Sequence, residues 1–139
     1  MFRVRAKSRY DELWRYNLVM SCAGIGVDGE VLYVTGNSRV ISEEFYPHRE
    51  VMPLVPADFI IGEPLDIDCE PAPLLRLLLY VIPYLFPDDI LIDKRKPFQF
   101  VVEVFSDGEL LCSREFDVNC WSGASIDFTI DIEDEKVSK

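Results

Sequence analysis

The sequence predicts a single globular α+β domain over residues 1–139, in which a mostly antiparallel sheet encloses one buried helix. Three observations favour this class. Residues 73–86 form an apolar run whose one charge is Arg76. Two Asp-Gly pairs separate apolar segments, which is typical of β-hairpins. Residues 126–133 alternate apolar and polar side chains, which is the period of a half-buried strand.

The apolar run at residues 73–86 is predicted to be the central helix. Its 14 residues are too few to cross a bilayer, which takes about 20. A helix that is apolar on every side must therefore be enclosed by protein. Pro73 suits a first helical turn, whereas Pro83 removes a hydrogen bond inside the helix and would kink or end it. We expect a buried, proline-kinked helix.

The N-terminal segment predicts a strand followed by a short helix. Residues 2–7 alternate apolar side chains with arginine and lysine, and such a cationic outer face suits the edge of a sheet. Ser8 can cap a helix over about residues 9–16. An extended conformation fits the same residues nearly as well, so both alternatives remain at this point.

Turn chemistry predicts two hairpins, because both central residues of a type I′ turn need positive φ and Asp-Gly tolerates this. The first joins residues 18–27 and 30–35, and the second joins 98–105 and 109–118. Further strands are expected at 39–46 and 58–61, and 134–139 should be a frayed tail.

The charge limits the classes of partner. The chain has 25 acidic and 14 basic residues, a net charge of −11, so nucleic acids and anionic membranes would meet a repelling field. A protein partner with a basic surface is favoured, although high solubility alone would also explain the charge. The chain begins without an apolar signal-peptide core, which predicts a cytoplasmic protein with reduced thiols.

No cofactor, metal site or catalytic residue is predicted. The four cysteines lack a CxxC spacing, and His48 is the single histidine, whereas structural zinc sites need four nitrogen or sulfur ligands. A disulfide between Cys112 and Cys120 stays open. Gly24-x-Gly26 lacks the third glycine and the following helix of a dinucleotide site.

Carboxylates on two segments are candidate partner-binding residues. Alternation places three on one side of an extended segment and three on the outer face of the last strand, and these are Asp66, Asp68, Glu70, Asp127, Asp131 and Glu133. Oxygen clusters also bind hard cations, and acidic loops are often only solvated. We favour a solvated or protein-contacting surface over a metal site.

Aromatic residues are the other candidates. Trp121 lies in a turn before the last strand, where it would be either an interface hot spot or a lid on the core. Phe45 and Tyr46 raise the same alternatives.

Together these features predict a small acidic protein-binding module, an inhibitor or immunity-type protein that masks a basic surface of its partner. The alternative is a structural or accessory subunit of a larger assembly, and a homo-oligomer is compatible with both. A small enzyme is less favoured, since no catalytic motif is present.

Overall fold

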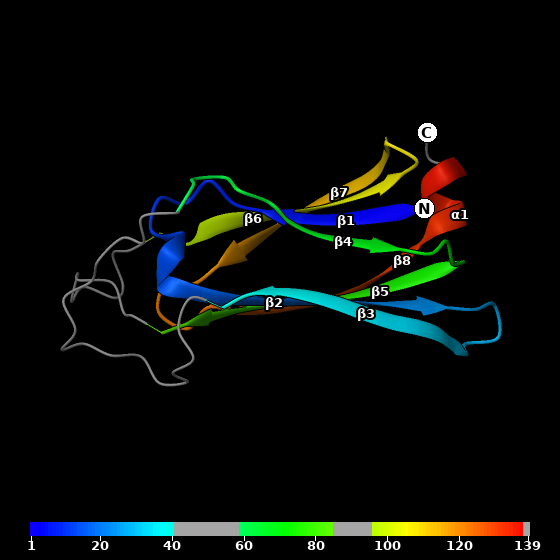
Figure 1. Ribbon diagram of the computed structural model, residues 1–139, viewed down its shortest axis with the longest axis horizontal. Helices are drawn as coiled ribbons and strands as arrows, with labels where there is room; N and C mark the ends of the chain where they lie inside the picture. The colour runs from blue at the N-terminus through cyan, green and yellow to red at the C-terminus, as the bar shows by residue number, and fades with distance from the viewer. Residues whose placement is uncertain (41–58, 85–95, 138–139) are drawn as a thin grey trace.

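The computed structural model describes residues 1–40, 59–84 and 96–137, and its strands form two antiparallel sheets of four strands each (Figure 1). Sheet A has the order β4-β1-β6-β7, and sheet B has the order β3-β2-β5-β8. The predicted α+β class is therefore wrong. The protein is a β-sandwich with a short helix at its C-terminal end.

The elements follow the chain in a simple order. The strands are β1 Phe2–Lys7, β2 Tyr16–Ile25, β3 Val31–Arg39, β4 Leu65–Cys69, β5 Leu74–Pro83, β6 Phe98–Ser106, β7 Glu109–Val118 and β8 Ala124–Asp131. One turn of 3-10 helix, η1 Leu13–Arg15, precedes β2, and the helix α1 Ile132–Val137 follows β8.

The predicted central helix at residues 73–86 is the strand β5, which pairs with β2 on one side and β8 on the other. Its side chains alternate between the core and the outer face of sheet B, so Leu77 and Leu79 are buried while Tyr80 and Ile82 are exposed. Periodicity cannot separate a helix from a strand in a run that is apolar on both faces. Pro83 is the last residue of the strand, not a kink.

The N-terminal strand is confirmed, but its predicted edge position is wrong. β1 lies between β4 and β6. The predicted helix over 9–16 is reduced to η1. Tyr84 fixes this turn to the end of β5, because its hydroxyl donates to the Trp14 carbonyl at 2.5 Å and its amide donates to the Arg15 carbonyl at 3.0 Å.

Both predicted hairpins are confirmed, as β2–β3 and β6–β7. The second has the expected turn, with φ of 48° at Asp107 and 87° at Gly108. In the first, Gly29 alone has positive φ, at 85°, and a bulge follows Gly24.

The remaining predictions for single segments had mixed outcomes. The predicted last strand is present as β8. Residues 59–61 lie outside any strand, contrary to prediction, and most of the predicted strand 39–46 falls outside the described residues. Much of the predicted tail is helical, since α1 extends to Val137.

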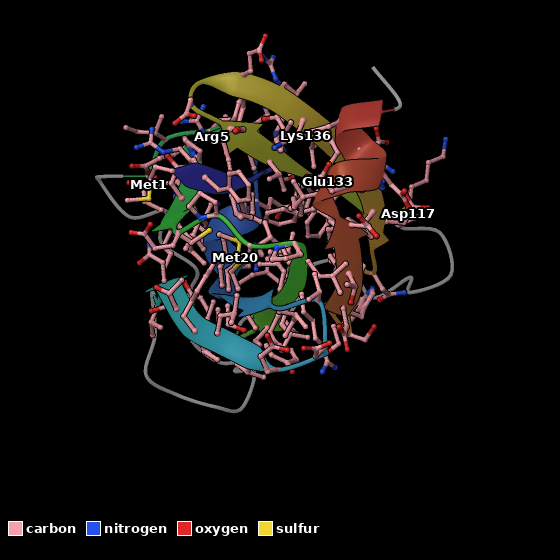
Figure 2. The ribbon with its side chains drawn as sticks, turned by 90° about the vertical axis from the view of Figure 1, so that its right-hand side faces the viewer. Met1, Arg5, Met20, Asp117, Glu133 and Lys136 are labelled. Carbon is pink, nitrogen blue, oxygen red and sulfur yellow. The ribbon has the colours of Figure 1, made fainter. Side chains whose placement is uncertain are left out.

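The core lies between the two sheets and runs the length of the sandwich. Tyr16 and Phe100 are completely buried in it. Figure 2 looks along the strands and shows Met20 pointing into this interior, where it is 2% exposed. Because both sheets bury one face, the functional candidates lie on the outer faces, the edges and the two ends.

Candidate protein-binding surface

The predicted binding residues Asp66 and Asp68 form cross-strand ion pairs. β4 runs antiparallel to β1, with Asp66 opposite Arg5 and Asp68 opposite Arg3. Each arginine binds its partner with two nitrogens, the shorter distances being 2.8 Å for Arg5 and 2.7 Å for Arg3. The hydrogen bond from Arg3 holds the pKa of Asp68 below its usual range. These carboxylates are therefore neutralised within sheet A.

Asp127 forms a similar ion pair on the outer face of sheet B. Arg76 of β5 donates to both of its carboxylate oxygens, at 3.2 and 2.9 Å. This bond holds the pKa of Asp127 below its usual range. The face predicted to be rich in free carboxylates is therefore locally neutral at this point.

The other three predicted acids come together at one end of the sandwich. β5 begins beside the end of β8 and the end of β2, and the N-terminus and α1 lie at this same end (Figure 1). The β2–β3 and β6–β7 turns add further carboxylates there. We call this set the acidic end: Asp28, Glu30, Glu70, Asp107, Glu109, Asp131, Glu133 and Asp134.

Few cations balance the acidic end, onto which Figure 2 looks directly. The N-terminal ammonium group lies 3.2 Å from Asp107. Arg114 pairs with Glu135 of α1, and Lys136 is exposed on the same helix. Asp131 accepts a hydrogen bond from the Asp134 amide at 3.2 Å and so stabilises the start of α1. Among the described residues, carboxylates remain in excess at this end.

The tip of the β2–β3 hairpin brings apolar side chains to the acidic end. Val27 is 82% exposed and Val31 is 62% exposed. The tip is internally bonded, because the Gly26 amide donates to the Glu30 carbonyl at 2.8 Å and the Asp28 amide donates to the Glu30 carboxylate at 3.2 Å. An ordered apolar tip surrounded by carboxylates is the arrangement of an interface centre with a polar rim.

The Gly24-x-Gly26 pair has a structural explanation. A Cβ at Gly24 would lie 2.3 Å from the Tyr33 ring, and a Cβ at Gly26 would lie 2.1 Å from the Glu30 carboxylate. Both glycines leave room for side chains of the returning segment. Tyr33 uses this space to donate its hydroxyl to the Glu70 carbonyl at 2.5 Å.

The predicted aromatic residues do not join the acidic end. Trp121 lies in the β7–β8 turn at the opposite end, where it is half-buried and packs against the core. Its amide donates to the Asn119 side chain at 2.8 Å. These contacts favour a lid on the core over an exposed anchor. Phe45 and Tyr46 lie outside the described residues, as does His48.

The described residues contain no group of three or more histidine, cysteine, aspartate or glutamate side chains that could hold a metal ion. All four cysteines are buried and none is in a disulfide, so Cys112 and Cys120 are not joined. A cleft of about 720 Å³ near residues 7–10 and 61–62 contains none of the predicted site residues. Within the described ranges, no helix is long and apolar enough to cross a membrane.

Sequence reasoning missed the hairpin tip as a binding element. Asp28 and Gly29 indicate a turn, and the alternation of the neighbouring segments predicts Val27 and Val31 only as strand residues. The signal that could have found the site is the placement of exposed valines on both sides of an acidic turn.

The comparisons with known proteins show no family. No family model matches the chain, and a search of curated proteins finds no match. Among solved structures, a DUF4425 family protein from Bacteroides ovatus ATCC 8483 is similar with a TM-score of 0.40 and 8% identity, covering 93% of this chain and 91% of that chain. This similarity is too weak to support an inference, and it indicates neither an enzyme nor a non-enzyme.

Proposed function

We propose that this protein is a small protein-binding module that contacts a basic partner through the acidic end and the tip of the β2–β3 hairpin. The finer role that fits this chemistry is that of an inhibitor or immunity-type protein, which occludes the partner's surface. The observation that carries the proposal is the presence of exposed Val27 and Val31 among the carboxylates of the acidic end.

The two parts of this surface have different expected roles. Exposed carboxylates attract a basic partner over several ångströms and raise the association rate, an effect that salt screens. Apolar side chains at the centre slow dissociation, because they lose contact with water in the complex. The internal hydrogen bonds of the tip support the proposal, since an ordered tip loses less conformational entropy on binding.

The proposal differs from the sequence-based expectation in which acids it uses. Asp66, Asp68 and Asp127 are already bound to arginines, so a partner cation would have to compete with an existing pair. Glu70, Asp131 and Glu133 remain in the proposed surface.

Affinity purification from cells that naturally make the protein, followed by kinetics with the purified partner, tests the proposal. Val27→Ser should raise the dissociation rate about tenfold, as expected when an apolar anchor is lost. Ile60→Ser is its control, because Ile60 is 61% exposed and lies outside the acidic end. Both variants should keep the stability of the original chain.

The charge contribution is tested separately with Glu133→Gln, which should lower the association rate and weaken its salt dependence. Glu115→Gln removes the same charge from β7, and it should change the association rate and its salt dependence much less. If the recovered partner binds all four variants as tightly and as fast as the original chain, the acidic end is not the binding surface.

A further inference from the structure

The four sheet edges of the sandwich differ in charge. β4, β7 and β8 each contain carboxylates at or near their edges. β3 differs, because residues 31–38 contain no charged residue and no proline, and Arg39 ends the strand. Natural sheets usually protect an edge with charge, proline or a covering element, because its free backbone groups can pair with another strand.

The edge of β4 is covered by β3 itself. Side chains from alternate positions of β3 reach across to backbone carbonyls of the β4 segment. Tyr33 donates to Glu70 at 2.5 Å, Asn37 to Asp66 at 2.9 Å, and Arg39 to Pro64 at 3.1 Å. The inner face of β3 is thus used within the chain, and its outer edge has no paired strand among the described elements (Figure 2).

The outward-facing side chains of β3 are also suited to an interface. Val34 is 68% exposed, and Gly36 and Ser38 are exposed on the same face. Next to Val34 in the neighbouring strand lies Ala23, which is half-buried. In a chain of net charge −11, an exposed edge without charge that carries Val34 is a candidate interaction surface.

We propose that two copies of this chain pair through antiparallel β3 edges, which joins their B sheets into one continuous sheet about a two-fold axis. The distribution of charge favours a second copy of this chain as the partner of the β3 edge. The other described edges are less suited to this pairing, because β3 side chains cover the edge of β4, and β7 and β8 carry Glu109, Glu115 and Asp131, which would repel an identical acidic chain. Antiparallel pairing brings the Arg39 end of each strand toward the Asp28 and Glu30 end of the other, whereas parallel pairing would bring like charges together.

The pairing leaves the two acidic ends at opposite sides of the dimer. A register centred on Thr35 would place Val34 opposite Gly36 of the partner subunit and keep all nine strand residues paired. This inference does not rest on the proposed binding function, since it is tested without a partner, although the two surfaces share Val31 and the turn at Asp28 and Glu30.

Light scattering coupled to size-exclusion chromatography, over a wide range of protein concentration, tests the pairing. The original chain should show twice the chain mass of 16.0 kDa. Val34→Lys places two lysines close together across the axis and should raise the dissociation constant by more than about tenfold. Circular dichroism confirms that each variant is folded, and Ser38→Lys replaces Val34→Lys if the latter does not fold.

Val19→Lys is the matched control, because Val19 lies on the outer face of the same sheet but in the inner strand β2. Edge pairing predicts that this variant stays dimeric. If the original chain is a monomer at every concentration, or if its dimer survives the β3 lysine variant, the inference is wrong. Loss of the dimer in Val19→Lys to the same extent would indicate face-to-face stacking and would also overturn it.

Discussion

Gly24 illustrates how a side chain on one strand can require a glycine on the next. The Tyr33 ring lies across the position that a Cβ at Gly24 would occupy, at 2.3 Å. Gly26 faces the mobile end of the Glu30 side chain instead. The two positions should therefore differ in how well they tolerate a side chain, although they lie two residues apart in the same hairpin.

We predict that Gly24→Ala lowers the free energy of unfolding by about 1–3 kcal/mol, because the Tyr33 ring must move and lose its hydrogen bond to Glu70. Gly26→Ala should cost less, since the Glu30 carboxylate can rotate away and loses only one exposed hydrogen bond, from the Asp28 amide. Urea unfolding of both variants measures the difference. Equal costs at the two positions would contradict this explanation.

The burial of the four cysteines leads to a second prediction at the residue scale, which concerns the reactivity of their thiols. All are buried and none is in a disulfide, and hydrogen bonding to Cys69 together with burial raises the pKa of the Cys22 thiol. A thiol reagent should react slowly with the native protein and should titrate four thiols after denaturation. Detection of only two thiols in the denatured, unreduced protein would mean that a disulfide forms, and Cys22 and Cys69 are the pair whose thiols are in contact.

At the scale of the element, substitutions in β5 can distinguish the observed strand from the helix that the sequence predicted. We expect Leu77→Ala to lower the free energy of unfolding by about 2–5 kcal/mol, because this side chain is buried between the sheets. Ile82→Ala should cost less than about 1 kcal/mol, because Ile82 is 40% exposed. Urea midpoints of the two variants provide the test. Similar losses at both positions would fit a helix that is buried on every side.

Local chemistry determined which elements could be predicted. The Asp107 and Gly108 turn is set by two adjacent residues, so the hairpin was found. Whether residues 74–83 form a strand depends on pairing with β2 and β8, which are distant in sequence. The apolar run alone therefore could not predict their secondary structure.

The candidate site also depends on contacts between segments that are distant in sequence. The sequence predicts Glu70, Asp131 and Glu133 as candidates for partner binding, but their position at the same end of the molecule depends on topology. The pairing of Asp66 with Arg5 depends on strand register, which sequence alone does not specify here.

The cross-strand ion pairs predict a pH dependence. Arginine contacts lower the folded-state pKa of Asp68 and Asp127 below the ordinary value of 3.8. These groups therefore stabilise the fold above that pH, and the contribution is lost as the pH falls through the lower folded-state pKa. Both are exposed, so salt should weaken the effect.

We expect Asp127→Asn to be less stable than the original chain at neutral pH and to approach it in stability as the pH falls below about 4. Urea unfolding at low and high salt, across this pH range, measures the effect. A stability difference that is the same at every pH would rule out the ion pair as its source.

On the scale of the whole molecule, the two ends of the sandwich have different properties. One end gathers α1, the N-terminus and the acidic turns around an apolar hairpin tip. Trp121 lies at the opposite end, in the β7–β8 turn. The antiparallel strands link the two ends through a continuous core.

Site-specific photo-crosslinking tests the proposed binding end most directly. A photoreactive residue placed at position 31 or at position 60 replaces side chains of nearly equal exposure, 62% for Val31 and 61% for Ile60. In the cells that make the protein, the label at position 31 should give a covalent complex with a partner that bears a basic surface and is distinct in mass from a second copy of this chain, and the label at position 60 should not. Equal crosslinking at both positions, or crosslinking at position 60 alone, would contradict the proposal.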